Sequence, residues 1–550
     1  MRFIPKRFWV AFIMIATMAV AACGAGSSTT PTVTLAKDQT LTLPNVGVSE
    51  IATFDPALPS DLNSGEAIQL TFSGLVSLDP NTLQVVADMA TVVPSVANGG
   101  ITNNGLTYTF HLRQNLKFSN GDPVTASTFA FSIDRSLDPR LKSNVATVYL
   151  GAIKGAMDRN SGKLSTIIGT GVVAQDPNTL VINLAQPVGY FLEAMTYSTS
   201  FAVDPNNASF TNAQWTDNAV GTGPFIMQSW QHNVQMTFVP NPNWYGAPTK
   251  ITKIVMPFVN DTSTAYQSYL AKQYDMDGLG NPLPSQQYVE AKALPNNQLH
   301  EGPYLETNYI SPNWNIAPFN NINVRKAFAM ATDRNTIAQT TLLNSVYPTD
   351  HIVPNGMPGY DQNLKGIPFN PQGAKQLLLS VYPDPSKMPQ VTLEYPAVGD
   401  NNKIAEELQA EYQTYLGVNI VLNGVTFNKL VGDVYTNKIQ FYLLAWIADY
   451  PDPQDWLSLQ FTQNAPNNTM NFNDPNFDAL TNKADVDQNQ TERFSLYNQA
   501  EELAVDEVGW IPFSQNKNTY VVQPWVHGLS IDAGGLVPDS EWANIYVTQH

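Results

Sequence analysis

The spacing of apolar residues along the chain predicts a protein in which strands and helices alternate. Residues 106–112 alternate between polar and apolar side chains, which is typical of a strand. The segment that starts at Thr125 predicts a helix, because its apolar residues recur every four positions and would line one face. These residues are Phe129, Ile133 and Leu137.

Three more helices are predicted in the second half. The first places Arg325 and Lys326 on its solvent side. Its apolar face consists of Val324, Ala327, Phe328, Ala331 and Ala338. The second begins at Asn370, an N-cap followed by proline, and Pro383 closes it. The third carries Ile404, Leu408, Tyr412 and Tyr415, ends at Gly417, and is followed by a strand over 418–422.

A continuous apolar run at 441–447 predicts a strand that is buried on both faces. The run ends abruptly at the polar, proline-rich segment 448–453. In open α/β sheets, ligands bind beyond the carboxyl ends of strands. Asp449 is therefore the first candidate for a ligand-binding residue.

The N-terminus predicts an exported lipoprotein. Arg2, Lys6 and Arg7 precede an apolar run at 8–22 that is too short to span a membrane comfortably. Cys23, the only cysteine, follows two small residues and is the expected lipidation site. Val20 stands where such signals more often carry Leu, so cleavage by ordinary signal peptidase is an alternative. Residues 24–34 are small and polar, as in a flexible tether.

Size and charge narrow the possible functions. A chain of 550 residues exceeds the limit of one hydrophobic core, so we expect at least two lobes. A lone cysteine leaves no intramolecular disulfide. The net charge of −18 and the lack of basic patches argue against nucleic acid as a partner. Once the signal is removed, only an acyl chain on Cys23 would hold the protein at a membrane.

The sequence lacks the usual motifs of catalytic and metal sites. Its six histidines are scattered, without metal-ligand spacing. No hydrolase elbow or P-loop occurs, and the glycine pair at 221 and 223 lacks the third glycine of a dinucleotide-binding pattern. We therefore expect no enzyme activity, no metal and no cofactor.

Several segments, in order, resemble the family 5 extracellular solute-binding proteins, the dipeptide and oligopeptide receptors of ABC importers. The most distinctive is 105–113 continued by 117–126. The resemblance also rests on 53–56, 72–75, 221–225, 241–246, 319–328 and 446–453.

The resemblance implies an α/β fold of the periplasmic-binding-protein type, with two lobes and a hinge between them. We place the signal peptide at 1–22 and the tether at 23–35. The first lobe, enlarged by an inserted subdomain, would comprise 36–278 plus 515–550, and the second lobe 279–514. A ligand would sit in the cleft, and closure would add contacts from the second lobe.

The resemblance also implies ligand-binding residues. Asp449 matches the aspartate that receives a peptide's α-ammonium, and such a charge-assisted hydrogen bond is worth about 1.5–3 kcal/mol. Trp446 and Tyr450 flank it and could line the pocket. Gly47 and Val48 match a strand that pairs with an extended ligand. We expect Asp452, before Pro453, to cap a turn.

One departure from the family affects specificity. Dipeptide-binding relatives carry an Arg for the ligand's carboxylate, whereas segment 395–402 contains no cation and only Lys403 follows it. The missing Arg favours peptides longer than two residues. We also expect a membrane permease as the partner and a receptor that is a monomer. The alternatives are a receptor for a neutral oligosaccharide or other small solute, a sensor that signals through a partner, and an exported hydrolase with a cryptic dyad.

Overall fold

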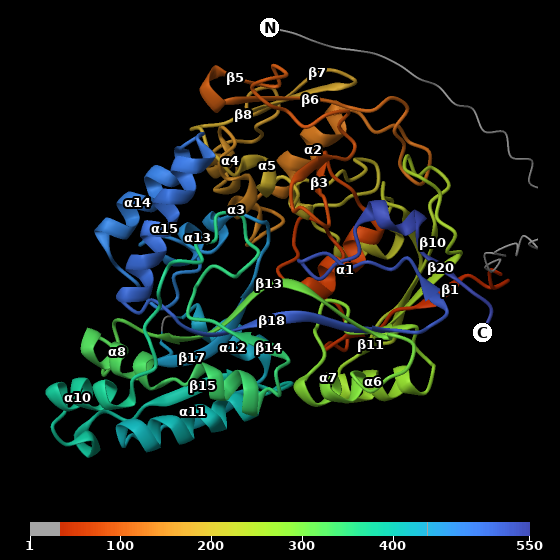
Figure 1. The fold of residues 1–550 in the computed structure, drawn as a ribbon. Coiled ribbons are helices and arrows are strands. Elements are labelled where there is room, and N and C mark those ends of the chain that lie inside the picture. Colours follow the sequence, from red (N-terminus) through yellow and green to blue (C-terminus); the bar gives the residue numbers. More distant parts are fainter. Residues whose placement is uncertain (1–33, 437) are drawn as a thin grey trace, which may run out of the picture.

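The computed structural model describes residues 34–436 and 438–550, and the chain forms two lobes of mixed α/β structure (Figure 1). The predicted signal peptide, Cys23 and the tether up to residue 33 lie outside the described residues. Leu35, the last residue assigned to the tether, forms an antiparallel bridge with Thr548. No helix among the described residues is long and apolar enough to cross a bilayer.

The first lobe contains a five-stranded sheet. Its order is β1 (Thr40–Thr42), β11 (Lys253–Val259), β10 (Gln235–Pro240) and β9 (Phe225–Gln231), with β2 (Asn45–Val46) also paired to β11. Buried side chains from this sheet and from α1 (Leu62–Thr71) form one core. Asp61 begins α1 by accepting a hydrogen bond from the Ser64 N–H.

A second, four-stranded sheet lies at the top of Figure 1 and has its own core. It runs β5 (Ile101–Thr102), β6 (Thr107–His111), β8 (Thr179–Asn183) and β7 (Val172–Asp176). The strand predicted over 106–112 is β6. The helix predicted after Thr125 is α2 (Ala126–Ser136), and all three of its predicted core residues are buried.

The second lobe is built on a seven-stranded sheet. Its order is β12 (Met276–Asp277), β18 (Ile511–Val522), β13 (Leu299–Pro312), β17 (Phe441–Ile447), β15 (Thr392–Pro396) and β16 (Val421–Val425), and β14 (Val346–Pro348) pairs with β18. Its main helices are α8 (Ile322–Ala331), α10 (Pro371–Val381), α11 (Asn401–Leu416), α14 (Pro475–Val486) and α15 (Gln490–Asp506).

Shorter elements complete the fold. They are β3 (Val76–Leu78), β4 (Val85–Ala87), α3 (Ala146–Leu150), α4 (Ala156–Asn160), α5 (Phe191–Ala194), α6 (Thr262–Leu270), α7 (Ser285–Ala291), α9 (Arg334–Thr336), α12 (Phe427–Val434), α13 (Ser458–Phe461), β19 (Val526–His527) and β20 (Tyr546–Val547).

Helix ends with strong local signals match the sequence predictions. Asn370 caps α10 by accepting from the Gly373 N–H. Gly417 ends α11 in the left-handed conformation, with φ 75°. The Val418 N–H then donates to the Tyr412 carbonyl, so Val418 still belongs to the helix end. For that reason the strand predicted over 418–422 forms later, at Val421–Val425.

The prediction for the helix over 324–338 is wrong in two respects. The helix ends at Ala331, because Thr332 is extended, and Ala338 lies in a separate turn at Ile337–Thr341. Arg325 is buried, with its guanidinium 3.7 Å from the centre of the Trp314 ring, and it donates to the carbonyls of Phe319 and Glu507. Trp314 and the C-terminal end of α15 therefore cover Arg325 on the face that the pattern assigned to solvent, and Lys326 is half-buried.

Two long antiparallel strands, β13 and β18, connect the lobes (Figure 1). Tyr520 of β18 packs in the first-lobe core, whereas Phe513 of the same strand packs in the second-lobe core. Helix α7 shares a cluster of buried residues with α6. The boundaries at 278/279 and 514/515 stay predictions. The packing of α7 favours a first crossing later in the chain, within β13.

Candidate functional site

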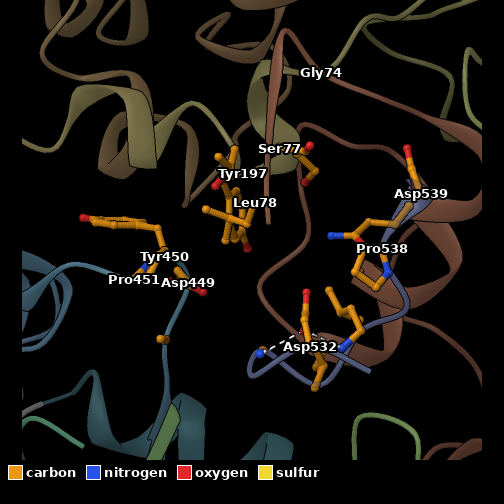
Figure 2. Close-up of a pocket in the computed structure, with 18 of the residues that line it drawn as sticks. Gly74, Ser77, Leu78, Tyr197, Asp449, Tyr450, Pro451, Asp532, Pro538 and Asp539 are labelled. Atoms are coloured by element: carbon orange, nitrogen blue, oxygen red, sulfur yellow. Dashed lines mark hydrogen bonds between the residues drawn. The ribbon is translucent and has the colours of Figure 1, made fainter. Parts of the chain in front are cut away.

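A cavity of about 210 Å³ lies between the lobes. The first lobe lines it with residues from 59–88, 196–201 and 532–540. The second lobe contributes Leu305 and residues 447–451. Figure 2 shows Asp449, Tyr450 and Pro451 on one side of the cavity and Pro538 and Asp539 on the other. Both lobes are therefore needed to enclose it.

Strand β17 delivers Asp449 to this cavity. The strand lies between β13 and β15, and its first three residues are buried. Its last four are half-buried, and Ile447 lines the cavity, so the prediction of burial on both faces holds only for the first part of the strand. The Asp449 N–H and the Trp446 indole N–H both donate to Asp455 Oδ2, each at 3.1 Å. Asp455 thus fixes the turn that follows the strand.

The Asp449 side chain meets the first lobe through one hydrogen bond. The Tyr149 hydroxyl donates to Asp449 Oδ2 at 2.5 Å, and the Tyr149 ring stacks on Tyr197 at 3.7 Å. Burial raises the pKa of Asp449 to about 6, although the Tyr149 hydrogen bond lowers it. Within the described chain, Asp449 forms no ion pair and its Oδ1 accepts no hydrogen bond. One carboxylate oxygen is therefore available to a ligand.

Tyr450 also contacts the first lobe. It is buried, lines the cavity and belongs to the core around the four-stranded sheet. Its ring stacks on Tyr190, with the centroids 6.1 Å apart and the planes 8° apart, and lies edge-on to Tyr149. Nearby, the Gly189 N–H donates to the carbonyl of Asp485 in α14. The two lobes are thus in direct contact beside the cavity.

The other residues predicted for the site lie elsewhere. Trp446 is half-buried and packs into the second-lobe core, and it is not among the residues that line the cavity. Gly47 follows β2 with φ 88° and is exposed, and neither it nor Val48 lines the cavity. Asp452 caps the turn at Pro453–Asp455, as expected from sequence, and also pairs with the buried Arg493 at 2.6 Å.

No Lys, Arg or His is among the described residues that line the cavity. Lys403, the one cation near the segment that lacks the expected Arg, pairs with Asp400 at 2.7 Å. Nor do the described residues contain a cluster of His, Cys, Asp and Glu that could hold a metal. A carboxylate inside the cavity would therefore find no cationic partner.

Sequence reasoning missed four aspartates that line the cavity: Asp61, Asp88, Asp532 and Asp539. Burial raises the pKa of Asp88 and that of Asp532 to about 6, and it raises the pKa of Asp539 well above its usual range. These residues come from distant parts of the chain and share no motif. Only the fold brings them together with Asp449.

The model of the family described as bacterial extracellular solute-binding proteins, family 5 middle, matches residues 91–468. The chain belongs to the family 5 bacterial extracellular solute-binding proteins. Among family relatives, the oligopeptide-binding protein OppA of Bacillus subtilis (strain 168) is 28% identical, over 97% of this chain and 98% of that protein.

Solved structures support the two-lobed fold of this family 5 protein. The murein tripeptide binding protein MppA of Escherichia coli matches with a TM-score of 0.80 and 26% identity, over 94% of this chain and 100% of that one. An unliganded open form of MppA covers the same 94% of this chain, and 99% of its own length, at 26% identity, but with a TM-score of 0.70. The lobes here are therefore arranged less like those of the open form.

Proposed function

We propose that this family 5 protein is the extracytoplasmic receptor of an ABC importer and captures oligopeptides between its lobes. The observation that carries the proposal is Asp449, a carboxylate without an ion-pair partner among the described residues, placed at the end of β17 against the cavity. A peptide's α-ammonium would supply the missing positive charge and donate to Oδ1. The relatives' roles in peptide binding support the same substrate class.

The charge of the cavity favours peptides longer than two residues. The α-carboxylate of a dipeptide would lie near its α-ammonium, among aspartates and away from any lining cation. A longer peptide can extend its carboxylate toward water. Titration calorimetry with alanine peptides of two to five residues and with neutral oligosaccharides tests the proposal. Binding of a saccharide but of no peptide would support the alternative ligand class.

We further expect a membrane-anchored receptor that acts with a permease. Cys23 would carry the lipid that anchors the mature receptor outside the cytoplasm, and the membrane-embedded permease would receive the peptide. The receptor would act as a monomer and perform no covalent chemistry. Mass spectrometry of membrane-extracted protein tests the anchor, because an N-terminal peptide that starts at an acylated Cys23 is expected.

Hinge closure should accompany binding. The Tyr149–Asp449 hydrogen bond and the Tyr190–Tyr450 stack join the two lobes beside the cavity, and a bound peptide would add contacts to both. We expect small-angle scattering to give a smaller radius of gyration with saturating peptide than without it. An equal radius in the two samples would contradict closure on binding.

Peptide affinity should fall as the pH is lowered from 7 to 5. The pKa of Asp449 is about 6 without ligand, so at pH 5 a proton must leave before the carboxylate can accept the α-ammonium. For one such group the affinity falls by about tenfold over this range. The titratable groups that interact with Asp449 are Tyr149, Tyr197, Tyr435, Tyr450 and Asp455.

Titration calorimetry with tetra-alanine at both pH values checks this prediction, because its α-ammonium stays mostly charged throughout. Repeating the titration at pH 6 in buffers of different ionisation enthalpy should reveal release of protons on binding. Circular dichroism at pH 5 verifies that the protein is still folded. Equal affinities at pH 5 and pH 7 would argue against Asp449 as the acceptor.

A further inference from the structure

The cavity contains more negative charge than one α-ammonium can neutralise. Among the described residues, five aspartates line it, and only Asp449 comes from the second lobe. The first lobe contributes Asp61, Asp88, Asp532 and Asp539. Figure 2 shows Asp449 and Asp539 on opposite sides of the cavity. A ligand held at Asp449 would therefore leave a second acidic region, formed by Asp88 and Asp539, on the far side.

Neutral groups hold the two carboxylates of this second acidic region. The Tyr245 hydroxyl donates to Asp88 Oδ1, and the Ser73 hydroxyl donates to Asp539 Oδ2 at 2.8 Å. Burial and, after it, the negative charge of Asp88 raise the pKa of Asp539, so the two carboxyl groups interact electrostatically. Hydroxyl donors orient a carboxylate but do not cancel its charge.

Within the described chain, none of the five aspartates forms an ion pair. The cation that acts on Asp88 is Arg113, which is exposed, lies 5.6 Å from the centre of the Tyr245 ring and does not line the cavity. Like charges confined in a cleft with low-dielectric walls attract a cation strongly. A cationic ligand would supply the missing countercharge.

We propose that the cavity selects peptides that carry a Lys or Arg side chain in addition to the α-ammonium, and that Asp88 and Asp539 are the residues that determine this preference. The inference rests on the proposed function, because it takes the α-ammonium to be held at Asp449. The side-chain cation would then lie between Asp88 and Asp539. A free polyamine offers the same two charges, so the test must separate the two ligand classes.

The experiment compares tetrapeptides of alanine in which one residue is replaced by Lys or by norleucine, which has the same length without the charge. Each of the first three positions is tested by titration calorimetry at pH 7. We expect the best lysyl peptide to bind at least about tenfold tighter than its norleucine counterpart. Spermidine is expected to bind more weakly than that lysyl peptide.

The variant D88N/D539N keeps the size of both side chains and removes their charge. It should bring the lysine-to-norleucine affinity ratio close to one, while the affinity for the norleucine peptide changes by less than about threefold. The matched control is D79N. Asp79 is a half-buried aspartate in the turn between β3 and β4 and does not line the cavity, so D79N should keep the wild-type ratio.

The outcomes separate this inference from the proposed function. Equal affinities of the wild-type protein for lysyl and norleucine peptides would overturn the inference and leave peptide capture intact, and this comparison needs no variant. A preference for lysine that D88N/D539N retains would overturn the assignment to Asp88 and Asp539, as would tighter binding of spermidine than of any peptide. Failure of every peptide to bind would overturn the proposed function itself.

Discussion

Replacing Asp449 with Ala should weaken the binding of a tetrapeptide roughly 10- to 100-fold at pH 7. This range corresponds to the 1.5–3 kcal/mol typical of a hydrogen bond to a charged group. The physical reason is that, in the described part of the chain, Asp449 is the only carboxylate that the second lobe contributes to the cavity lining, and its Oδ1 is available to an ammonium group. Titration calorimetry gives the two dissociation constants.

An N-acetylated tetrapeptide provides the sharper comparison, because acetylation removes the charge that Asp449 is proposed to receive. It should bind the wild-type protein weakly, and D449A should weaken it little further. The matched control variant is D433A. Asp433 lies in the last turn of α12, pairs with Lys429 and does not line the cavity. If D449A binds the free peptide as tightly as D433A does, the α-ammonium is held elsewhere.

Replacing Asp55 with Ala should lower the free energy of unfolding of the first lobe by about 3–5 kcal/mol, because it leaves a buried cation without its partner. Arg135 is 1% exposed and donates to both carboxylate oxygens of Asp55, at 2.9 and 2.6 Å. The Trp215 indole also donates to Asp55, and the Ser209 carbonyl is the other acceptor for Arg135. A neutral side chain at position 55 cannot compensate the positive charge of Arg135.

Urea unfolding monitored by circular dichroism and tryptophan fluorescence measures the decrease in the free energy of unfolding. The matched control is D158A, which breaks an exposed ion pair between Asp158 and Lys163 in the same lobe and should cost less than about 1 kcal/mol. If D55A and D158A lower the free energy of unfolding equally, the buried Arg135 charge does not depend on Asp55 for its stabilisation. Affinity for peptide, measured on folded D55A, should stay near the wild-type value, since Asp55 does not line the cavity.

Local signals in the sequence were sufficient for many elements. Asn370 followed by proline and the glycine at 417 act within one helical turn, so α10 and α11 end where the sequence predicts. The apolar run that became β17 was long enough to identify without its neighbours. The same run placed Asp449 at the end of a strand, where ligand sites of α/β proteins occur.

Local sequence patterns did not predict which side chains are buried by segments that are distant along the chain. Arg325 has the charge of a surface residue, yet Trp314 and the end of α15 cover it. Trp446 stands three residues before Asp449, but the strand's alternation turns it toward the second-lobe core and not toward the cavity. Proximity to Asp449 in the sequence therefore did not identify the other residues that line the cavity.

Contiguous residues were enough to identify the family, the alternation of strands and helices, and the aspartate that follows the seven-residue strand, because motifs and periodicities are local. The contact of Tyr149 with Asp449 across the lobes depends on long-range packing, and so does the shared cavity lined by Asp61, Asp88, Asp532 and Asp539. The reason is physical: a cavity's charge is the sum over side chains that long-range packing brings together, and no local pattern records that sum.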